Sequence, residues 1–173
     1  MFDLVIIGGG PAGVSAGVYA ARKRLTTCFI TKDWGGQSIV STDIQNWIGT
    51  PHIKGSDLAK AFRAHVEEYR GDKLSILESE VTAITGSDGN FTVTTSSGEQ
   101  NSKTVLIATG SARRKLEVPG ADKLEHKGLT YCASCDGPLF GGMDVVVVGG
   151  GNAGFESAAQ LLAYCKSVTL LSR

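Results

Sequence analysis

The segment YCASCDG places Cys132 and Cys135 three positions apart, with Asp136 directly after the second cysteine. Such a pair serves as half of a metal site, as a structural disulfide, or as a redox couple that opens and closes during turnover. A zinc site needs four ligands, usually as two paired sets, and His126 is the only histidine near this single pair. A static disulfide across so short a loop would constrain the unfolded chain very little. The residues therefore favour a redox couple, and we predict no metal site.

Two glycine-rich turns indicate a different chemistry, the binding of a diphosphate. Each has the spacing G-x-G-x-x-G, follows a short apolar run and opens a segment with helical periodicity. In such a turn the first glycine bends the chain, the second lets backbone N–H groups approach a pyrophosphate, and the third lets helix and strand pack closely. The glycines concerned are Gly8, Gly10, Gly13, Gly149, Gly151 and Gly154. The repeated context favours two dinucleotide sites over ordinary glycine turns of a doubly wound sheet that binds no nucleotide.

The end of the second strand in each unit selects the ribose that is bound. In the first unit this position lies near Thr31, Lys32 and Asp33, where the expected acidic partner of the ribose hydroxyls is displaced or absent. In the second unit it lies at Ser172 and Arg173, with no carboxylate to repel a 2′-phosphate and one cation able to pair with it. The second unit is therefore predicted to prefer NADPH to NADH.

The elements that must position these residues form an α/β pattern. Apolar runs at residues 3–7 and 26–31 flank a helical segment, which makes a βαβ unit, and a second such unit starts at residue 144. Residues 56–70 have an apolar face at helical spacing. From residue 77 to residue 108 the period changes to two, with turn residues between three runs, which predicts a small antiparallel β meander. The cysteine pair lies just ahead of the second βαβ unit.

Composition excludes several classes of partner. The chain has 173 residues, 42% of them hydrophobic and 20% charged, and its 17 basic residues balance 17 acidic ones. Without a net positive charge, we expect no binding to nucleic acid or to an anionic membrane surface. No segment approaches the roughly 18 apolar residues of a membrane span. The start MFDLVIIGGG is not typical of a signal peptide, so we predict a cytoplasmic protein.

Six motifs occur in an order typical of one enzyme family: VIIGGGPAG, GGQ, DIQNWIG, LIATGS, YCASCDGPLF and VVVVGGGNAG. In this respect the chain resembles the low-molecular-weight thioredoxin reductases and the flavoprotein subunit of alkyl hydroperoxide reductase, which are FAD-dependent pyridine nucleotide-disulfide oxidoreductases. The segment CDGPLF, followed by GGGNAG, is closer to the latter. The resemblance covers essentially the whole chain. Members of the family are considerably longer, so the resemblance also implies that this chain is truncated.

The resemblance implies a specific fold with two domains. Residues 1–114 are expected to form a Rossmann-like FAD-binding domain with three layers, two of strands and one of helices (ββα). The meander belongs to this domain. Residues 115–173 are expected to form the beginning of a second, Rossmann-like nicotinamide domain that carries the CxxC pair. By matching position, the expected FAD contacts are Gly8, Gly10, Pro11, Ala12, Gly13, Thr31, Lys32, Gly35, Gly36, Gln37, Asn46, Thr109 and Gly110. The expected contacts of the nicotinamide dinucleotide are Gly149, Gly151, Asn152, Ala153, Gly154 and Arg173.

The same resemblance assigns a role to each residue of the CxxC segment. Electrons would pass from NADPH to FAD, then to a Cys132–Cys135 disulfide, and from there to thioredoxin or a thioredoxin-like protein. Cys135 would be the sulfur next to the flavin, Cys132 the nucleophile for the external disulfide, and Asp136 the acid that protonates the departing thiolate. A second interpretation, which does not exclude this role, is that Asp136 caps a turn before Gly137 and Pro138. The resemblance also implies a homodimer. The alternative function is a flavin-binding module without disulfide reductase turnover.

Overall fold

The computed structural model describes residues 1–111, 114–125 and 127–172, and it divides into two compact units, Met1–Ala112 and Arg113–Arg173. Each unit is described by itself below. The sequence places the corresponding boundary after residue 114. Within the described residues, no helix has both the length and the apolar character that a membrane crossing requires.

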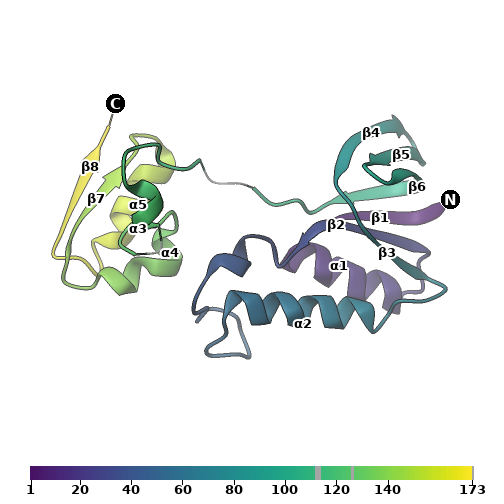
Figure 1. The fold of residues 1–173 in the computed structure, drawn as a ribbon, viewed down its shortest axis with the longest axis horizontal. Helices are drawn as coiled ribbons and strands as arrows, with labels where there is room; N and C mark the ends of the chain where they lie inside the picture. The colour runs from purple at the N-terminus through teal and green to yellow at the C-terminus, as the bar shows by residue number, and fades with distance from the viewer. Residues whose placement is uncertain (112–113, 126, 173) are drawn as a thin grey trace. The chain divides into compact units, whose positions relative to one another are not determined.

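The first unit is built on one six-stranded sheet with the strand order β3-β2-β1-β6-β5-β4 (Figure 1). Strands β1, β2, β3 and β6 run parallel, and β4, β5 and β6 pair antiparallel. The strands are β1 (Phe2–Gly9), β2 (Thr27–Trp34), β3 (Leu74–Glu78), β4 (Val81–Ser87), β5 (Asn90–Thr95) and β6 (Gly98–Ile107). The helices are α1 (Pro11–Arg22), α2 (Gly55–Glu67) and the short 3₁₀ helix η1 (Gly36–Val40).

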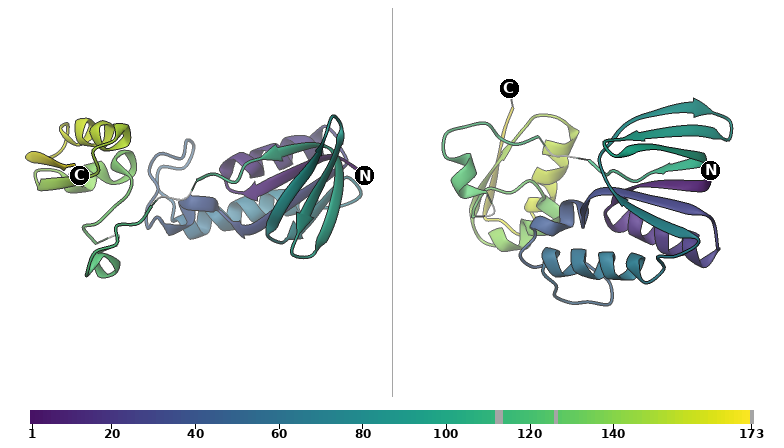
Figure 2. Two further views of the ribbon diagram at one scale, coloured as in Figure 1. Left: turned by 90° about the horizontal axis from the view of Figure 1, so that it is seen from above. Right: turned by 45° about the vertical axis from the view of Figure 1, so that its right-hand side comes forward.

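Helices α1 and α2 lie side by side against one face of the parallel strands (Figures 1 and 2). Their apolar residues recur at helical spacing, so Val18 of α1 and Phe62 and Val66 of α2 all face the sheet. There they meet Ile6 and Phe29, whose side chains are fully buried. This helix layer holds the larger of the two apolar cores of the unit and fixes the β1–α1–β2 geometry on which the first glycine turn depends.

The meander covers the opposite face of the parallel strands. Strand β4 begins just after β3 in the chain, yet β3 and β4 are at opposite edges in the strand order, so the sheet must fold back over itself. Val93 of β5 is fully buried against Val5 and Ile30 of the parallel strands. At the crossing, the hydroxyl of Ser79 lies 2.8 Å from that of Ser96. The three layers, ββα, and the small meander confirm the fold class predicted from the sequence.

One strand was missed by the sequence pattern. Strand β3 (Leu74–Glu78) pairs in parallel with β2, whereas the sequence predicts only a meander from residue 77 onward. The strand is five residues long, and only Ser79 and Glu80 separate it from β4. The sequence pattern therefore does not distinguish β3 from β4 as separate strands. The predicted helix 56–70 is confirmed as α2, with slightly different ends.

The second unit contains a parallel pair, β7 and β8, joined through α5. Its elements are α3 (Ala121–Leu124), α4 (Ala133–Asp136), the 3₁₀ helix η2 (Gly137–Phe140), β7 (Asp144–Val148), α5 (Asn152–Leu161) and β8 (Ser167–Leu171). Burial alternates along both strands: Val145 and Val147 are half-buried, while Val146 and Val148 are exposed. One face of this two-stranded sheet is therefore covered and the other is open.

Candidate functional site

The turn between β1 and α1 contains three glycines that are needed for different reasons. Gly8 has a φ of +125°, a left-handed conformation that favours glycine. A Cβ atom at Gly13 would overlap the carbonyl oxygen of Gly8, so only glycine lets the helix start this close to the strand. Gly10 differs, because its φ of −82° suits any residue and a Cβ atom there would lie 3.7 Å from its nearest neighbour, the Cα atom of Gly36. The chain itself does not require glycine at position 10, because a Cβ atom there would make only an ordinary van der Waals contact.

The first turn of α1 is suited to a negative charge. Pro11 occupies the first helical turn, and the N–H of Val14 donates to the carbonyl of Gly10 over 3.0 Å. No side chain caps the helix, and the first turn has no acidic residue. The N–H groups of Ala12 and Gly13 are therefore available to an anion beside Gly10.

The turn between β7 and α5 repeats this stereochemistry. Gly149 has a φ of +130°, and a Cβ atom at Gly154 would overlap the carbonyl oxygen of Gly149. Gly151 has a φ of −89°, and a Cβ atom there would have no neighbour within 4 Å among the described residues. Asn152 and Ala153 open α5, which has no capping side chain and no acidic residue in its first turn. At both turns the second glycine could take a Cβ atom without overlap, and a helix start without a capping side chain lies beside it.

The Gly35–Gly36 turn packs directly on the first glycine loop. The N–H of Gly35 donates to the carbonyl of Gly9 over 2.8 Å. A Cβ atom at Gly36 would lie only 3.2 Å from the Cα atom of Gly10. The structure therefore brings these two predicted contact residues to the same edge of the sheet as the glycine loop, 25 residues or more along the chain.

The end of β6 reaches the same edge. The N–H of Ala108 donates to the carbonyl of Ile7 over 2.8 Å, and a Cβ atom at Gly8 would overlap the carbonyl oxygen of Ala108. Thr109 and Gly110 follow at once, and both are exposed. The structure thus brings Thr109 and Gly110 next to the residue that packs on Gly8.

The end of β2 is arranged differently from what its sequence suggests. The hydroxyl of Thr31 is buried beneath Gly9 and donates to the carbonyl of Asp33 over 2.6 Å, so its hydrogen is already used within the turn. Lys32 is exposed and pairs with Glu80 over 3.2 Å. Glu80 therefore brings a carboxylate to the end of β2 from the connection between β3 and β4.

Two predicted FAD contacts, Gln37 and Asn46, lie further out on the segment between β2 and α2. Both are exposed, and within the residues that the structure describes neither side chain makes a hydrogen bond. Next to Asn46, the ring of Trp47 packs edge-on against Phe62 at 5.3 Å, which anchors this segment on α2. Arg173, predicted to contact the second dinucleotide, lies outside the described residues.

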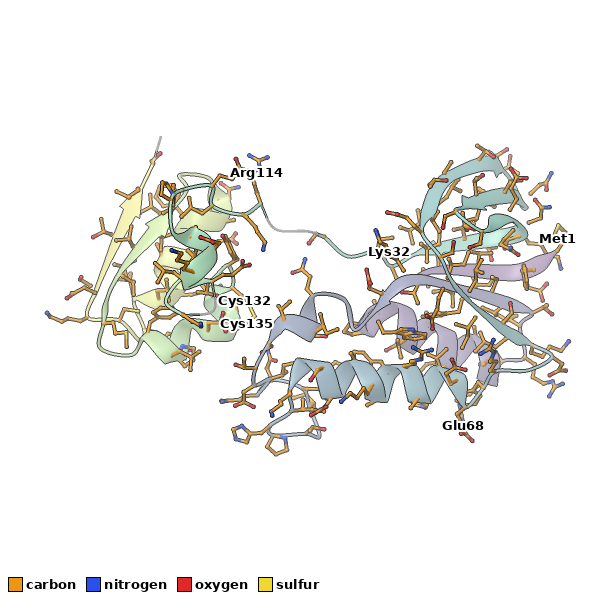
Figure 3. All side chains as sticks on the ribbon, viewed as in Figure 1. Met1, Lys32, Glu68, Arg114, Cys132 and Cys135 are labelled. Carbon is orange, nitrogen blue, oxygen red and sulfur yellow. A yellow bond between two sulfur atoms is a disulfide. The ribbon has the colours of Figure 1, made fainter. Side chains whose placement is uncertain are left out.

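Cys132 and Cys135 form a disulfide, with their Cα atoms 5.2 Å apart. Figure 3 shows the two labelled cysteines side by side where α4 begins. Cys132 is the N-cap residue of α4, and its Sγ accepts the N–H of Cys135 over 3.2 Å. Cys135 is exposed and Cys132 is half-buried. The pair is therefore bonded within one helical turn and accessible from outside the unit.

Asp136 is tied to the same turn through Thr130. The hydroxyl of Thr130 donates to Oδ2 of Asp136 and accepts the N–H of Cys132, the latter over 3.3 Å. The N–H of Asp136 in turn donates to the carbonyl of Cys132 over 3.0 Å. The Asp136 side chain does not cap η2, so the alternative of a turn cap is wrong.

The remaining cysteines are separate from this pair. Cys28 is buried in β2, where desolvation raises the pKa of its thiol. Cys165 is half-buried beyond the end of α5. Among the described residues, no group of three or more His, Cys, Asp or Glu side chains could hold a metal ion.

Sequence reasoning missed one residue in each unit, Glu80 in the first and Thr130 in the second. Thr130 bonds Asp136 across six positions, within a segment that has no periodicity to predict its conformation. Glu80 meets Lys32 across 48 positions, through a strand that the pattern did not resolve. A Thr two residues before a CxxC motif is a usable signal in the first case, whereas the second has none in the sequence.

Comparison with known proteins gives a consistent result. The family model described as pyridine nucleotide-disulphide oxidoreductase matches residues 2–173. The chain is 41% identical to a subunit of alkyl hydroperoxide reductase in Escherichia coli over 172 residues, which cover 98% of this chain and 33% of that protein. The corresponding protein of Xanthomonas campestris is 41% identical over 171 residues, 98% of this chain and 32% of that one.

Solved structures point to the same group of proteins. Thioredoxin reductase from Streptococcus pyogenes is 38% identical with a TM-score of 0.88, and the match covers 98% of this chain and 55% of that one. Thioredoxin reductase from Giardia duodenalis is 32% identical, also with a TM-score of 0.88 and the same coverage. The chain thus spans about a third of the length of its curated relatives and about half of these two reductases.

Proposed function

The chain belongs to the pyridine nucleotide-disulphide oxidoreductase family, and on that premise we propose that it takes part in NADPH-dependent reduction of a protein disulfide. The observation that carries this proposal is the Cys132–Cys135 disulfide, which lies beside Asp136 in the unit that also contains the second glycine turn. A pair of cysteines bonded within one accessible turn can exchange with an external thiol, because thiolates attack disulfides they can reach.

The family implies a flavin, and the first unit has the features to hold FAD. The open space at Gly10 and the free start of α1 would receive the diphosphate, and the Gly35–Gly36 turn and Thr109 border the same edge. The full set proposed for FAD is Gly8, Gly10, Pro11, Ala12, Gly13, Thr31, Lys32, Gly35, Gly36, Gln37, Asn46, Thr109 and Gly110. When bound, FAD supplies two-electron chemistry between a nicotinamide and a dithiol.

The second glycine turn is proposed to hold the nicotinamide dinucleotide. Its open space lies at Gly151, beside the free start of α5. The proposed contacts are Gly149, Gly151, Asn152, Ala153, Gly154 and Arg173. The proposed preference for NADPH rests on the sequence after Leu171, because Ser172 and Arg173 include no carboxylate that would repel a 2′-phosphate.

Cys132, Cys135 and Asp136 are each proposed to have a different role in the disulfide chemistry. Reduction adds two electrons and two protons to the Cys132–Cys135 bond and leaves two thiols. Asp136 would supply one proton to the sulfur that departs as a thiolate. Cys132 would then attack an external disulfide, and the mixed disulfide would be resolved by Cys135, which restores the internal bond and releases a reduced partner.

The external disulfide is proposed to belong to thioredoxin or a thioredoxin-like protein. This choice follows the names of the solved relatives, whereas the curated relatives are named for an alkyl hydroperoxide. We also propose a homodimer and a cytoplasmic location, where a reducing environment lets the cysteine pair cycle.

The test uses the purified chain loaded with FAD, without oxygen. On addition of NADPH, we expect the yellow colour to bleach and two new thiols to form at Cys132 and Cys135, as detected by alkylation and mass spectrometry. NADH in the same assay tests the proposed nucleotide preference. Bleaching without new thiols would instead identify a flavin-binding module without turnover, and no bleaching at all would contradict the nicotinamide assignment.

A further inference from the structure

The hydroxyl of Thr130 lies between the carboxylate of Asp136 and the main chain of Cys132. From this contact we infer that Thr130 is a positioning residue, which fixes the Asp136 oxygen that carries the proton in disulfide opening. The inference rests on the proposed function, because it assigns Thr130 a part in the same sulfur chemistry.

The direction of the hydrogen bonds decides which oxygen is involved. The N–H of Cys132 can only donate, so the Thr130 oxygen must accept there. The single hydrogen of the hydroxyl points at Oδ2 of Asp136, which accepts it. As long as Thr130 donates to Oδ2, a proton on the Asp136 carboxyl lies on Oδ1. A β-branched threonine keeps this arrangement because its χ1 rotamers are restricted.

The Asp136 carboxylate is also fixed relative to the cysteines. Its own N–H donates to the carbonyl of Cys132 over 3.0 Å, so main chain and side chain both connect it to the same residue. A second contact holds the helical turn from outside: Ser134 donates to Gln160 of α5 over 2.8 Å. These contacts connect the Asp136 carboxylate to the same helical turn that carries the disulfide.

The step that this arrangement serves can be written with a small dithiol as the reductant. One thiolate of the dithiol attacks a sulfur of the Cys132–Cys135 bond, forming a mixed disulfide and breaking the internal bond. The departing cysteine thiolate takes the proton from Oδ1 of Asp136, which becomes a carboxylate. The second thiol of the reductant loses its proton to solvent and attacks the mixed disulfide. This releases the second cysteine as a thiolate, so the pair has gained two electrons. Both cysteines end as thiols or thiolates, and the reductant ends as a cyclic disulfide.

Other titratable groups face this turn. The thiols of Cys132 and Cys135 belong to it, Tyr131 adjoins it, and the ring of Tyr164 faces Gly137 at the start of η2. The test therefore needs variants that separate Asp136 from these groups. Thr130→Val removes both hydrogen bonds at nearly constant shape, Thr130→Ser retains the hydroxyl, and Thr130→Ala is a smaller truncation should valine disturb the fold. Thr169→Val, an exposed threonine in β8 of the same unit, is the matched control.

The measurement is the rate at which dithiothreitol reduces the pair in the full 173-residue chain between about pH 5 and pH 9. Thr130→Val is expected to slow reduction about tenfold, since a general acid contributes about 10²–10⁴-fold and the variant removes only its positioning. Thr130→Ser should restore the rate to within about threefold, and Thr169→Val should leave it unchanged. In an Asp136→Asn background, Thr130→Val should have no further effect.

Three results would overturn the inference. The first is a wild-type rate and pH profile in both Thr130→Val and Thr130→Ala, with Asp136→Asn slow. The second is an equal loss on Thr130→Val with and without Asp136. The third is a wild-type rate in Asp136→Asn itself, which removes the acid that Thr130 is said to orient. The proposed function fails differently, because dithiothreitol needs no cofactor: a chain that shows the full Thr130 effect but gains no thiols from NADPH contradicts that function alone.

Discussion

The two glycine turns have the same stereochemistry, but the sheets that carry them differ greatly in how well they are buried. In both turns the first glycine has a strongly positive φ, the third is packed against the first, and the second could take a Cβ atom without overlap. In the first unit, however, β1 lies between two parallel strands and is covered on both faces, so Val5 and Ile6 are fully buried. In the second unit, β7 pairs only with β8 among the described strands, and Val146 and Val148 remain exposed.

This comparison separates what a diphosphate turn needs from what a stable domain needs. The turn is local: a strand, three glycines and the first turn of a helix are enough to create its open space and its free N–H groups. Stability depends on layers, because apolar area removed from water on both faces of a sheet provides the main driving force. The same sequence motif therefore predicts the same cradle in both units without predicting equal stability.

The largest effect is expected at the cysteine pair, which only the second unit has. Replacing Cys132 or Cys135 with serine should lower NADPH-dependent disulfide reduction at least about a thousandfold, because the nucleophile or its bonded partner is gone. FAD affinity should stay close to that of wild type, since the first unit is untouched. The rate of thioredoxin reduction measures the activity, and flavin fluorescence measures the FAD affinity.

Cys165→Ser provides the matched control in the same unit, because Cys165 is a free, half-buried cysteine. Its activity should equal that of the wild type. Substantial reductase activity in either Cys132→Ser or Cys135→Ser would remove the pair from the proposed electron path.

The next effect concerns stability and tests the difference in layering directly. Phe29→Ala in the first unit should lower the free energy of unfolding by about 3–5 kcal/mol, because it empties a fully buried site. Val148→Ala in the second unit should cost less than about 0.5 kcal/mol, because that side chain is exposed. Denaturant unfolding followed by circular dichroism covers both units.

Tryptophan fluorescence sharpens this measurement, since Trp34 and Trp47 are the only tryptophans and both lie in the first unit. Trp34 stacks on Phe29 at 5.4 Å and so reports the substituted site itself. A loss at Val148→Ala as large as that at Phe29→Ala would show that the open face of β7 is covered in solution.

A smaller effect separates two glycines of one turn. Gly13→Ala should destabilise the first unit by about 1–3 kcal/mol, because the new methyl group overlaps the carbonyl oxygen of Gly8. Gly10→Ala should leave stability within about 0.5 kcal/mol of wild type, yet weaken FAD binding about tenfold or more, because the methyl group enters the space proposed for the diphosphate. Calorimetric titration measures the FAD affinity of both variants, and thermal unfolding measures their stability.

Gly151→Ala and Gly154→Ala are the equivalent pair for the nicotinamide dinucleotide in the second unit. A Gly10→Ala chain that binds FAD normally would show that the open space is not where the diphosphate lies.

The smallest effect is electrostatic and belongs to the first unit. Lys103, by donating to the carboxylate, and the N–H of Thr26 lower the pKa of Asp3 below its ordinary value of 3.8. Asp3 therefore contributes stability above that pH, and the contribution is lost as the pH falls through the lowered pKa. In Asp3→Asn, the stability of the first unit should therefore fall less steeply as the pH is lowered from about 5 to about 2. Unfolding followed by tryptophan fluorescence measures this stability. An unchanged pH dependence would contradict this assignment.

The sequence predicted both βαβ units, the meander and the enzyme family, and the fold and the family match confirm these. The elements were predictable because glycine spacing and apolar period act over short distances, whereas the family came from the resemblance of six ordered motifs. The sequence pattern missed β3, which is only five residues long and leads almost directly into β4. It also missed the bond from Thr130 to Asp136, because α4 is a four-residue helix within a segment without periodicity. Contacts such as Lys32 with Glu80 depend on tertiary folding, which local patterns do not encode.

The most direct measurement is the number of electrons that the FAD-loaded chain accepts in an anaerobic titration with dithionite. If the Cys132–Cys135 pair is in redox contact with the flavin, wild type should take up about four electrons per flavin, and Cys135→Ser about two. Uptake of about two electrons by both proteins, with the disulfide intact afterwards, would contradict the account.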